Sequence, residues 1–542
     1  MLTALSKEQK GWIKEKIDTM SRREKIGQVL VMLQGERKLE EYLEEYPIGG
    51  MLVGVKSPED ALKMKESIDE YNRTHDIPFI QAADLENGAG IIKGRGTSFP
   101  AIMALGAVDS TELAREMGRA TAREARPYGI SWTYAPVVDL DFDFNNSMTY
   151  GRAFGRSPEH VARLARAFIG GCQEDGLLAC AAKHFPGDGF DARDPHVVTP
   201  VITLSREEWT ATYGHVYREV IDEGVMSIMT GHVALPAFDE GEGGYLGPPP
   251  ATMSTALQVE LLRGELGFDG LIVSDAVDMI GYASRLPKPQ RAVRTLAAGA
   301  DIALRVEERD FDWIEEAVER GELSEERLND AVRRVLEFKM RIGAFGEQNY
   351  PLVDDEGKRR HEETARSISE GAIHIVRNEG ELLPLKLSSG ARLLSMDLQF
   401  PARDGSKAAG LREIPAALRE RGYEVDHMVS PLHGDFDIYP IIDNYEAVFV
   451  NFNIPPRYGC QKMNGSVLDA LWNGWWVDHG KVVFTSFFNP FAIWEVPWVP
   501  NYVNAFHNNP RSQRAAVKVW LGEMPARGKS PVGLEGFFEV EV

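Results

Sequence analysis

Cysteine is scarce in this chain, whose 542 residues include only Cys172, Cys180 and Cys460. The three form no C-x-x-C pair and no cluster with metal-ligand spacing, which argues against a disulfide scaffold, a redox centre and a zinc site. We therefore expect them to be small buried apolar residues of a protein in a reducing compartment. A chain of this length can bury a large core and is expected to divide into about two domains.

Long apolar runs are also missing, since no window approaches about 18 uncharged apolar residues. The N-terminus becomes charged at Lys7 and Glu8, before the apolar core of a signal peptide could form. We therefore expect a cytoplasmic protein that does not enter membranes. The chain has no dinucleotide-binding fingerprint, no P-loop and no metal-binding cluster in its sequence, so we expect no cofactor and no metal.

Positive charge is in deficit, because 82 acidic residues face 60 basic residues and leave a formal net charge of −22. Such a charge repels nucleic acid and anionic lipid surfaces over long range. Polyanionic partners are therefore not expected. The oligomeric state is left open by the sequence.

Short apolar runs alternate with helical patterns from about residue 27 to 306, which is typical of repeated βα units around a parallel sheet. Eight such units predict a (β/α)₈ TIM-type barrel with its active site at the carboxyl ends of the strands. A doubly wound open sheet would also bind ligands at strand ends, so this pattern alone leaves the α/β architecture open. The eight candidate strands are Gly27–Leu33, Gly49–Val55, Pro78–Ala83, Ile130–Val138, Leu177–His184, Met226–His232, Gly270–Asp275 and Ala300–Arg305.

The remainder of the chain predicts a second α/β domain. An amphipathic helix is expected over Leu323–Arg341, followed by the turn-rich stretch Gly343–Pro351. Apolar runs then recur at Ala372–Val376, Ala447–Asn451 and Lys481–Thr485. We predict a barrel domain over residues 1–342, a linker over 343–371 and a C-terminal α/β domain over 372–542.

The loop after the fifth candidate strand is dense in titratable groups and punctuated by glycine and proline, as expected of a functional loop on a rigid strand. Within it, Asp194 and His196 are two residues apart. A carboxylate there can orient an imidazole and stabilise its protonated form, giving a group that donates and later accepts a proton. The alternative is an ordinary solvated loop in which Asp194 begins a turn and His196 is merely exposed.

The seventh candidate strand delivers one carboxylate, Asp275, to its carboxyl end. A carboxylate in that place can attack an anomeric carbon and form a covalent glycosyl-enzyme, while a separate acid protonates the departing oxygen. The alternative is that Asp275 caps the following helix. Other polar residues at strand ends are Asp84, Glu86, Asp139, Asp141, Lys183, His184, His232, Ser274 and Arg305.

These residues carry a family resemblance. Lys183–Gly189 with Asp194-Pro195-His196, followed by Ser274-Asp275, resembles glycoside hydrolase family 3 in its exo-β-N-acetylglucosaminidase branch, which has the signature K-H-F-P-G-x-G…D-x-H. The similarity covers nearly the whole chain. Further matching segments lie at residues 84–88, 98–101, 105–107, 135–139, 151–155, 250–254, 261–270, 376–385 and 528–534.

The resemblance implies a barrel followed by a C-terminal α/β sandwich domain. It also implies Asp275 as the nucleophile and His196, paired with Asp194, as the acid/base. The residues that it implies for binding sugar hydroxyls are Asp84, Arg152, Lys183 and His184. Carboxylates and cations at strand ends suit that role, because they make charge-assisted hydrogen bonds to a neutral sugar. The alternative for Arg152 and Lys183 is a salt bridge to a nearby carboxylate.

Three positions depart from the family pattern. Asp188 stands where the signature usually has a second histidine, Asn87 replaces the first glycine of a pair, and Ala89 stands where an arginine is common. These changes affect contacts to the leaving group and the outer subsites, and they leave the nucleophile and the Asp–His pair intact. His232 is expected to be a satisfied core histidine.

The function expected from this sequence is a retaining exo-β-N-acetylglucosaminidase that acts on an oligosaccharide or glycopeptide such as a cell-wall fragment or a chitooligosaccharide. One alternative is a β-glucosidase or β-xylosidase of the same family, whose acid/base is usually a carboxylate of the C-terminal domain. Another alternative is a non-catalytic carbohydrate-binding protein. The presence of both Asp275 and His196 disfavours the last, because binding alone requires neither a nucleophile nor a proton donor.

Overall fold

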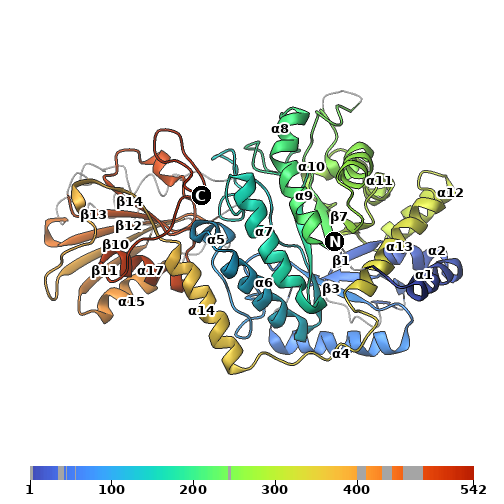
Figure 1. Cartoon of the computed structure of the whole chain (residues 1–542), viewed down its shortest axis with the longest axis horizontal. Helices are drawn as coiled ribbons and strands as arrows, with labels where there is room; N and C mark the ends of the chain where they lie inside the picture. Colours follow the sequence, from blue (N-terminus) through green and yellow to red (C-terminus); the bar gives the residue numbers. More distant parts are fainter. Residues whose placement is uncertain are drawn as a thin grey trace. The chain divides into compact units, whose positions relative to one another are not determined.

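Figure 1 shows the chain as a computed structural model, which describes residues 4–34, 42–43, 45–54, 57–241, 246–399, 410–429, 442–455 and 480–542. The chain divides into two compact units. The first comprises Met1–Phe99, Thr111–Leu140 and Val161–His361, and the second Pro100–Ser110, Asp141–His160 and Glu362–Val542. Both units are discontinuous along the sequence, and the continuous domain ranges given above stay predictions. Cys460 and Val55 lie outside the described residues.

The first unit is a closed barrel of eight parallel strands in sequence order, which confirms the predicted TIM-type fold. The barrel closes because β1 pairs with both β2 and β8, with Val31 opposite Gly50 and Leu304. Each strand overlaps one predicted run. The strands are β1 (Leu30–Leu33), β2 (Gly50–Leu52), β3 (Ile80–Ala83), β4 (Ile130–Thr133), β5 (Ala179–Phe185), β6 (Ser227–Thr230), β7 (Leu271–Ala276) and β8 (Ile302–Leu304).

Helices alternate with these strands and pack around the outside of the barrel (Figure 1). Several begin at side-chain caps that the sequence supplies, such as the capping boxes that start with Ser6, Ser21 and Ser205. The helices of this part of the chain include α1 (Lys7–Thr19), α2 (Arg22–Gln28), α4 (Pro58–Thr74), α6 (Thr111–Ala125), α7 (Pro158–Gln173), α8 (Arg206–Ala211), α9 (Tyr213–Glu223), the π-helical η4 (Ala256–Glu265), α10 (Ile280–Ala283), α11 (Arg291–Ala297), α12 (Asp310–Glu319), α13 (Glu325–Arg341) and α14 (Asp355–Gly371). Within the described ranges, every helix is too short or too polar to span a bilayer.

The barrel interior is filled with apolar side chains, and the end of α13 joins that core. Phe338 of α13 packs in the same cluster as Trp132 of β4, with ring centroids 5.1 Å apart. The buried Lys339, whose pKa burial lowers to about 7, donates from Nζ to the Gln28 side-chain oxygen at 2.7 Å and to the carbonyls of Gly49 and Pro78 at 2.9 and 2.7 Å. Because these acceptors precede β1, β2 and β3, one side chain holds together the amino-terminal ends of three strands.

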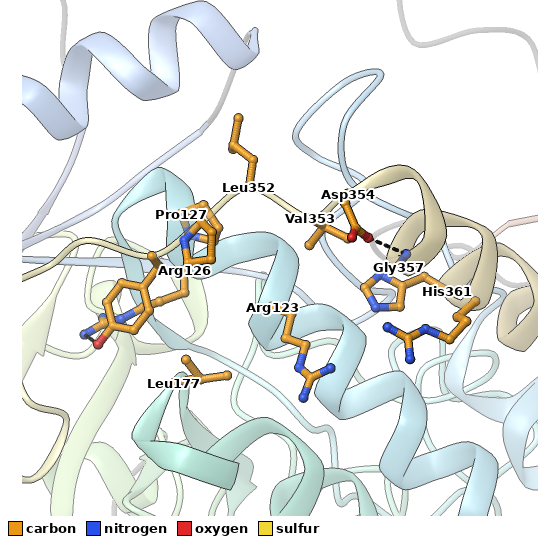
Figure 2. Close-up of a pocket in the computed structure, with 12 residues that line it drawn as sticks. Arg123, Arg126, Pro127, Leu177, Leu352, Val353, Asp354, Gly357 and His361 are labelled. Atoms are coloured by element: carbon orange, nitrogen blue, oxygen red, sulfur yellow. Dashed lines mark hydrogen bonds between the residues drawn. The ribbon is translucent and has the colours of Figure 1, made fainter.

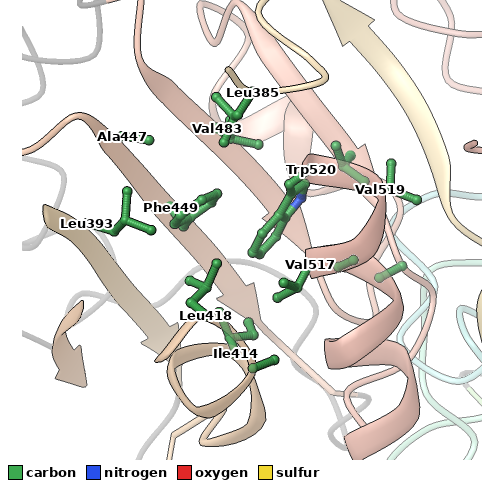
Figure 3. Packing of buried hydrophobic residues seen from close by; sticks show 14 of the residues in the cluster. Leu385, Leu393, Ile414, Leu418, Ala447, Phe449, Val483, Val517, Val519 and Trp520 are labelled. Carbon is green, nitrogen blue, oxygen red and sulfur yellow. The ribbon is translucent and has the colours of Figure 1, made fainter. Parts of the chain in front are cut away.

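The second unit is built on a six-stranded sheet in the order β11-β10-β12-β13-β14-β9. It is mixed, since β9 is antiparallel to β14 while the other pairs are parallel. Figure 3 shows α17 (Pro510–Trp520) packed on the sheet, where the Trp520 ring stacks on Phe449 with centroids 4.4 Å apart. Its elements also include α5 (Ile102–Val108), β9 (His374–Asn378), β10 (Arg392–Gln399), α15 (Glu413–Glu420), β11 (Glu424–Val429), β12 (Ala447–Asn453), β13 (Val482–Ser486) and β14 (Asn501–Asn504).

Candidate active site

Polar side chains meet at the carboxyl ends of β3, β4, β5 and β7. Asp84 follows β3, Lys183 and His184 end β5, and Asp275 is the last but one residue of β7. The carboxyl ends of parallel barrel strands lie on one rim, which is where active sites of this fold are found. These four predicted residues therefore share one rim.

Asp139, six residues beyond the end of β4, organises the beginning of the loop after β5. Its side chain is 1% exposed and accepts three hydrogen bonds, from the backbone N–H of His184 at 3.0 Å, from the His184 ring Nδ1 at 2.7 Å and from the backbone N–H of Asp188 at 2.9 Å. Because a carboxylate only accepts, the His184 ring carries its proton on Nδ1. The Nε2 atom of His184 is thereby the one left for contact with a ligand.

Asp194 and His196 form the predicted pair. Asp194 Oδ1 accepts from the His196 backbone N–H at 2.8 Å and lies 2.8 Å from the ring Nδ1. The Asp194 side chain is 4% exposed, whereas that of His196 is 28% exposed, so the carboxylate is covered while the imidazole reaches solvent. Asp194 also begins a turn, since its carbonyl accepts from the N–H groups of Val197 and Val198. The turn and the pair coexist, and the turn serves to place the pair.

Three contacts fasten this loop to the segment that follows Asp275. The Ile280 N–H donates to the His196 carbonyl at 3.1 Å, and the Thr199 hydroxyl donates to the Gly281 carbonyl at 2.8 Å. Gly281 permits the close approach, because a Cβ there would lie 2.2 Å from the Pro195 carbonyl oxygen. Glycine at position 281 thus lets the backbone of the loop after β5 contact the backbone of the segment after β7. This contact brings His196 to the side of the rim that carries Asp275.

Asp275 does not cap the next helix, because α10 begins at Ile280 with Met279 as a cap that offers no side-chain hydrogen bond. Its Oδ1 accepts from the N–H of Ala276 at 2.7 Å. Burial alone would raise the pKa of Asp275, but the charges of His232, His184 and Lys183 and the hydrogen bond from Ala276 outweigh it and lower the pKa. Asp275 is therefore an ionised carboxylate at neutral pH, as a nucleophile requires.

Lys183 forms an ion pair on the same rim. Its Nζ lies 3.0 Å from Asp84 Oδ1 and 2.7 Å from Glu86 Oε1. The Lys183 side chain is almost fully buried, whereas that of Asp84 is 55% exposed. The salt-bridge alternative is thus realised for Lys183, and Asp84 still presents oxygen atoms to a ligand.

Two further predicted residues, Arg152 and His232, make contacts of a different kind. Arg152 lies in the second compact unit, where its guanidinium donates to the carbonyl of Met148 at 3.0 Å. His232 is fully buried, with Nε2 2.8 Å from the Ala276 carbonyl and Nδ1 2.9 Å from the Thr252 hydroxyl. Burial lowers the pKa of His232 although the charge of Asp275 raises it. His232 is the core histidine that was expected, and it supports the backbone directly after Asp275.

Tyr134 was missed by the sequence reasoning. Burial raises its pKa well above the usual value, and the negative charges of Asp84 and Asp275 raise it further. Its hydroxyl is buried and has no hydrogen-bond partner among the described residues. The phenol therefore stays protonated, and its hydroxyl can donate a hydrogen bond near the two carboxylates. Its position one residue beyond β4 was the available signal.

Several known proteins are similar to this chain. Residues 21–338 match the family described as the glycosyl hydrolase family 3 N-terminal domain. A relative from Cellulomonas fimi, named beta-N-acetylglucosaminidase/beta-glucosidase, is 32% identical over 545 residues, which cover 96% of this chain and 95% of the relative. A beta-hexosaminidase A from Pseudoalteromonas piscicida is 28% identical over 376 residues, covering 64% of this chain and 62% of that protein.

Two solved structures resemble almost the entire chain. A β-N-acetylglucosaminidase of glycoside hydrolase family 3 from Paenibacillus sp. superposes with a TM-score of 0.82 at 27% identity, covering 97% of this chain and 100% of the other. A beta-glucoside phosphorylase superposes with a TM-score of 0.87 at 26% identity, covering 98% and 97%. Similarity over both compact units thus extends to proteins with different named reactions.

The contact at Gly281 generates a prediction. In Gly281→Ala the new methyl group must displace the Pro195 carbonyl, and with it the loop that holds Asp194 and His196. We expect kcat/KM to fall about 10- to 100-fold. Because His196, the predicted proton donor, is the residue that moves, the loss should be larger for alkyl glycosides than for nitrophenyl glycosides. Gly11→Ala, at a helical glycine with no atom within 4 Å, is the control and should leave both rates unchanged. Equal losses on both substrate classes in Gly281→Ala would contradict the assigned contact.

Proposed function

This chain belongs to glycosyl hydrolase family 3, and we propose that within the family it acts as a retaining exo-β-N-acetylglucosaminidase. The substrate class is a carbohydrate with a terminal GlcNAc, such as a chitooligosaccharide or a glycopeptide fragment of a cell wall. The observation that carries the proposal is the pair of Asp194 and His196, joined through Ile280 to the segment that follows Asp275. The pair supplies a proton donor and acceptor within the barrel domain itself.

In the first step, a carboxylate oxygen of Asp275 attacks the anomeric carbon and forms an ester with the sugar. The bond to the glycosidic oxygen breaks, and that oxygen takes the proton from the Nε2 atom of His196. Nε2 is the available nitrogen because Nδ1 faces Asp194. The buried carboxylate of Asp194 stabilises the imidazolium that exists before this transfer.

In the second step, the neutral His196 accepts a proton from water while the water oxygen attacks the anomeric carbon. The ester to Asp275 breaks, its carboxylate is regenerated, and His196 returns to the protonated state. Two displacements at one carbon retain its configuration. Asp84, Lys183 and His184 are proposed to bind the sugar hydroxyls, with charged groups giving hydrogen bonds of about 1.5–3 kcal/mol each.

A β-glucosidase activity is a second candidate, because the name of the Cellulomonas fimi relative includes it. The discriminating measurement compares hydrolysis of nitrophenyl β-GlcNAc, β-glucoside and β-xyloside under identical conditions. We expect the highest kcat/KM on β-GlcNAc and a first product of β configuration by NMR. An inverted first product would exclude the covalent intermediate, and no turnover of any of the three would favour a protein that only binds carbohydrate.

The role of Asp275 is tested by Asp275→Asn. The amide keeps the shape of the side chain but removes the charge that attacks the sugar, so we expect kcat to fall roughly 10⁴-fold or more in a protein that remains folded. Asp278→Asn is the matched control, since Asp278 lies three residues further on and pairs with Arg305 at 2.8 Å. Near-normal turnover by Asp275→Asn would refute the nucleophile assignment.

His196 with Asp194 and His184 with Asp139 are two imidazole–carboxylate pairs of the barrel loops, and comparing them allows a controlled test of His196. His196→Ala should reduce turnover of a methyl glycoside far more than that of a dinitrophenyl glycoside, whose leaving group departs without a proton. Asp194→Ala should act in the same direction. His184→Ala, which removes the imidazole paired with Asp139, should affect both substrates by the same factor because it binds the sugar. If the leaving-group dependence follows His184 instead, the acid/base assignment passes to that residue.

Phosphorolysis is a further candidate reaction, supported by the similarity to a beta-glucoside phosphorylase. A neutral imidazole repels an incoming anion less than a carboxylate would, so a phosphate oxygen could replace water in the second step and give the sugar 1-phosphate. The carboxylate of Asp188, which is buried near Asp139, opposes this by adding negative charge. We expect some GlcNAc 1-phosphate in phosphate buffer, and more of it from Asp188→Asn. If the rate does not depend on phosphate and GlcNAc is the sole product, hydrolysis is the only reaction and phosphorolysis is excluded.

A further inference from the structure

A cavity of about 280 Å³ lies at the end of the barrel opposite the catalytic rim. The 3₁₀ turn η1 (Arg126–Tyr128) immediately precedes β4, and Leu177 precedes β5, so the cavity borders the amino-terminal ends of these strands. Its other walls are the end of α6, residues 350–354 and the first turns of α14 (Figure 2). Nothing in the proposed reaction uses this cavity.

Arg126 is a buried cation without an anionic partner in the described part of the chain. Its side chain, in a residue 2% exposed, donates to three neutral acceptors, the Ile342 carbonyl at 3.2 Å, the Gln348 side-chain oxygen at 2.6 Å and the Tyr350 hydroxyl at 3.4 Å. Its guanidinium lies 4.7 Å from the centre of the Tyr350 ring, and its Nε has no acceptor. Burial lowers the pKa of Arg126. A buried charge of this kind is costly unless an opposite charge comes to it.

The acid nearest to Arg126 in the sequence, Glu124, forms hydrogen bonds with other residues. Glu124 accepts from the Thr97 backbone N–H at 2.6 Å, from the Thr97 hydroxyl at 2.7 Å and from the His361 ring Nδ1 at 2.7 Å. Its carboxylate therefore orients His361, whose Nε2 has no protein partner among the described residues. Nε2 is therefore the ring nitrogen of His361 that remains for a ligand in the cavity.

Arg123 adds a second guanidinium to the lining. It is exposed at the end of α6, and no acceptor within the described ranges takes a hydrogen bond from it. In Figure 2 its side chain lies between η1 and the start of α14. The acid that lines the cavity, Asp354, accepts from the Gly357 N–H at 2.7 Å and so serves to start α14.

The remaining walls are apolar. Pro127, Leu177, Pro351, Leu352 and Val353 all line the cavity. Leu352 is 51% exposed, although it is a large aliphatic side chain. A bare inorganic ion would leave this surface uncovered, whereas a ligand with an apolar body would cover it.

We propose that this cavity binds a small organic anion, in which a carboxylate or phosphate is attached to a ring or a short apolar group. The anionic group meets Arg123, His361 Nε2 and the field of Arg126, and the apolar body lies on Leu177 and Pro351. Planar guanidinium groups match the paired oxygens of these anions. The formal net charge of −22 repels polyanions from the chain as a whole, which favours a ligand of one or two charges.

Binding has a structural consequence within this unit. Residues 350–354 connect α13 to α14 and form one wall, while α6 and η1 form the opposite wall. A ligand held by both walls would fasten the connecting segment to the barrel. Amide exchange in residues 350–358 should therefore slow when the ligand is present.

The experiment uses the full chain and phenyl phosphate as the probe, with binding measured by calorimetry and amide exchange by mass spectrometry. We expect saturable binding, slower exchange at residues 350–358, and weaker binding of inorganic phosphate or phenol alone. Arg123→Gln should weaken the binding of phenyl phosphate at least tenfold. Arg115→Gln is the matched control, because it removes the same charge from an exposed position of α6 outside the cavity.

Ligand binding at this cavity can be tested independently of the roles proposed for Asp275 and His196. Equal binding by Arg123→Gln and Arg115→Gln, or no binding at all, would overturn the proposed site. Inorganic phosphate binding as tightly as phenyl phosphate would overturn the requirement for an apolar body, and phenol binding as tightly would overturn the requirement for an anion. Asp275→Asn should bind the probe like the unchanged chain, so an inactive enzyme does not bear on this site.

Discussion

The arrangement of the rim depends on the buried carboxylate of Asp139. A charge that is 1% exposed is tolerable only with donors around it, and Asp139 receives two hydrogen bonds from His184 near the end of β5 and one from Asp188 in the loop that follows. Hydrogen bonds to a charged group are worth about 1.5–3 kcal/mol each, and here they oppose the conformational freedom of the residues that donate them. The hydrogen bonds to Asp139 therefore fix the direction in which the loop leaves β5.

The far part of that loop is fixed by a second device, the backbone contact with the segment after β7. The hydrogen bonds to Asp139 hold the beginning of the loop. The hydrogen bonds of His196 with Ile280 and of Thr199 with Gly281 hold its far part. Between these two anchors, the turn that begins at Asp194 directs the imidazole outward. The backbone on both sides of His196 is thus held in place, and the proton transfer that we propose for this residue requires such positioning.

Much of this could be predicted from sequence, because strands and local pairs leave local signals. The eight apolar runs located all eight barrel strands, and the two-residue spacing located the pair of Asp194 and His196. The first run began too early: Gly27 belongs to α2, because the capping box of Ser21 and Glu24 starts a helix that continues to Gln28. The pairing of Asp139 with His184 has no local signal, since the partners are 45 residues apart.

The two ends of the barrel hold their buried charges in different ways, and this difference suits different tasks. At the carboxyl rim, imidazoles and Lys183 face carboxylates, so a proton can move within a pair without leaving a lone charge in a low dielectric. At the amino end, Lys339 and Arg126 rest on neutral oxygens. Neutral acceptors hold a cation in place but do not cancel its field. Burial lowers the pKa of Lys339 to about 7, whereas the guanidinium of Arg126 stays charged, so the uncompensated cation among the described residues at this end is Arg126. At the other end, Lys183 and the two imidazoles already face carboxylates before substrate arrives.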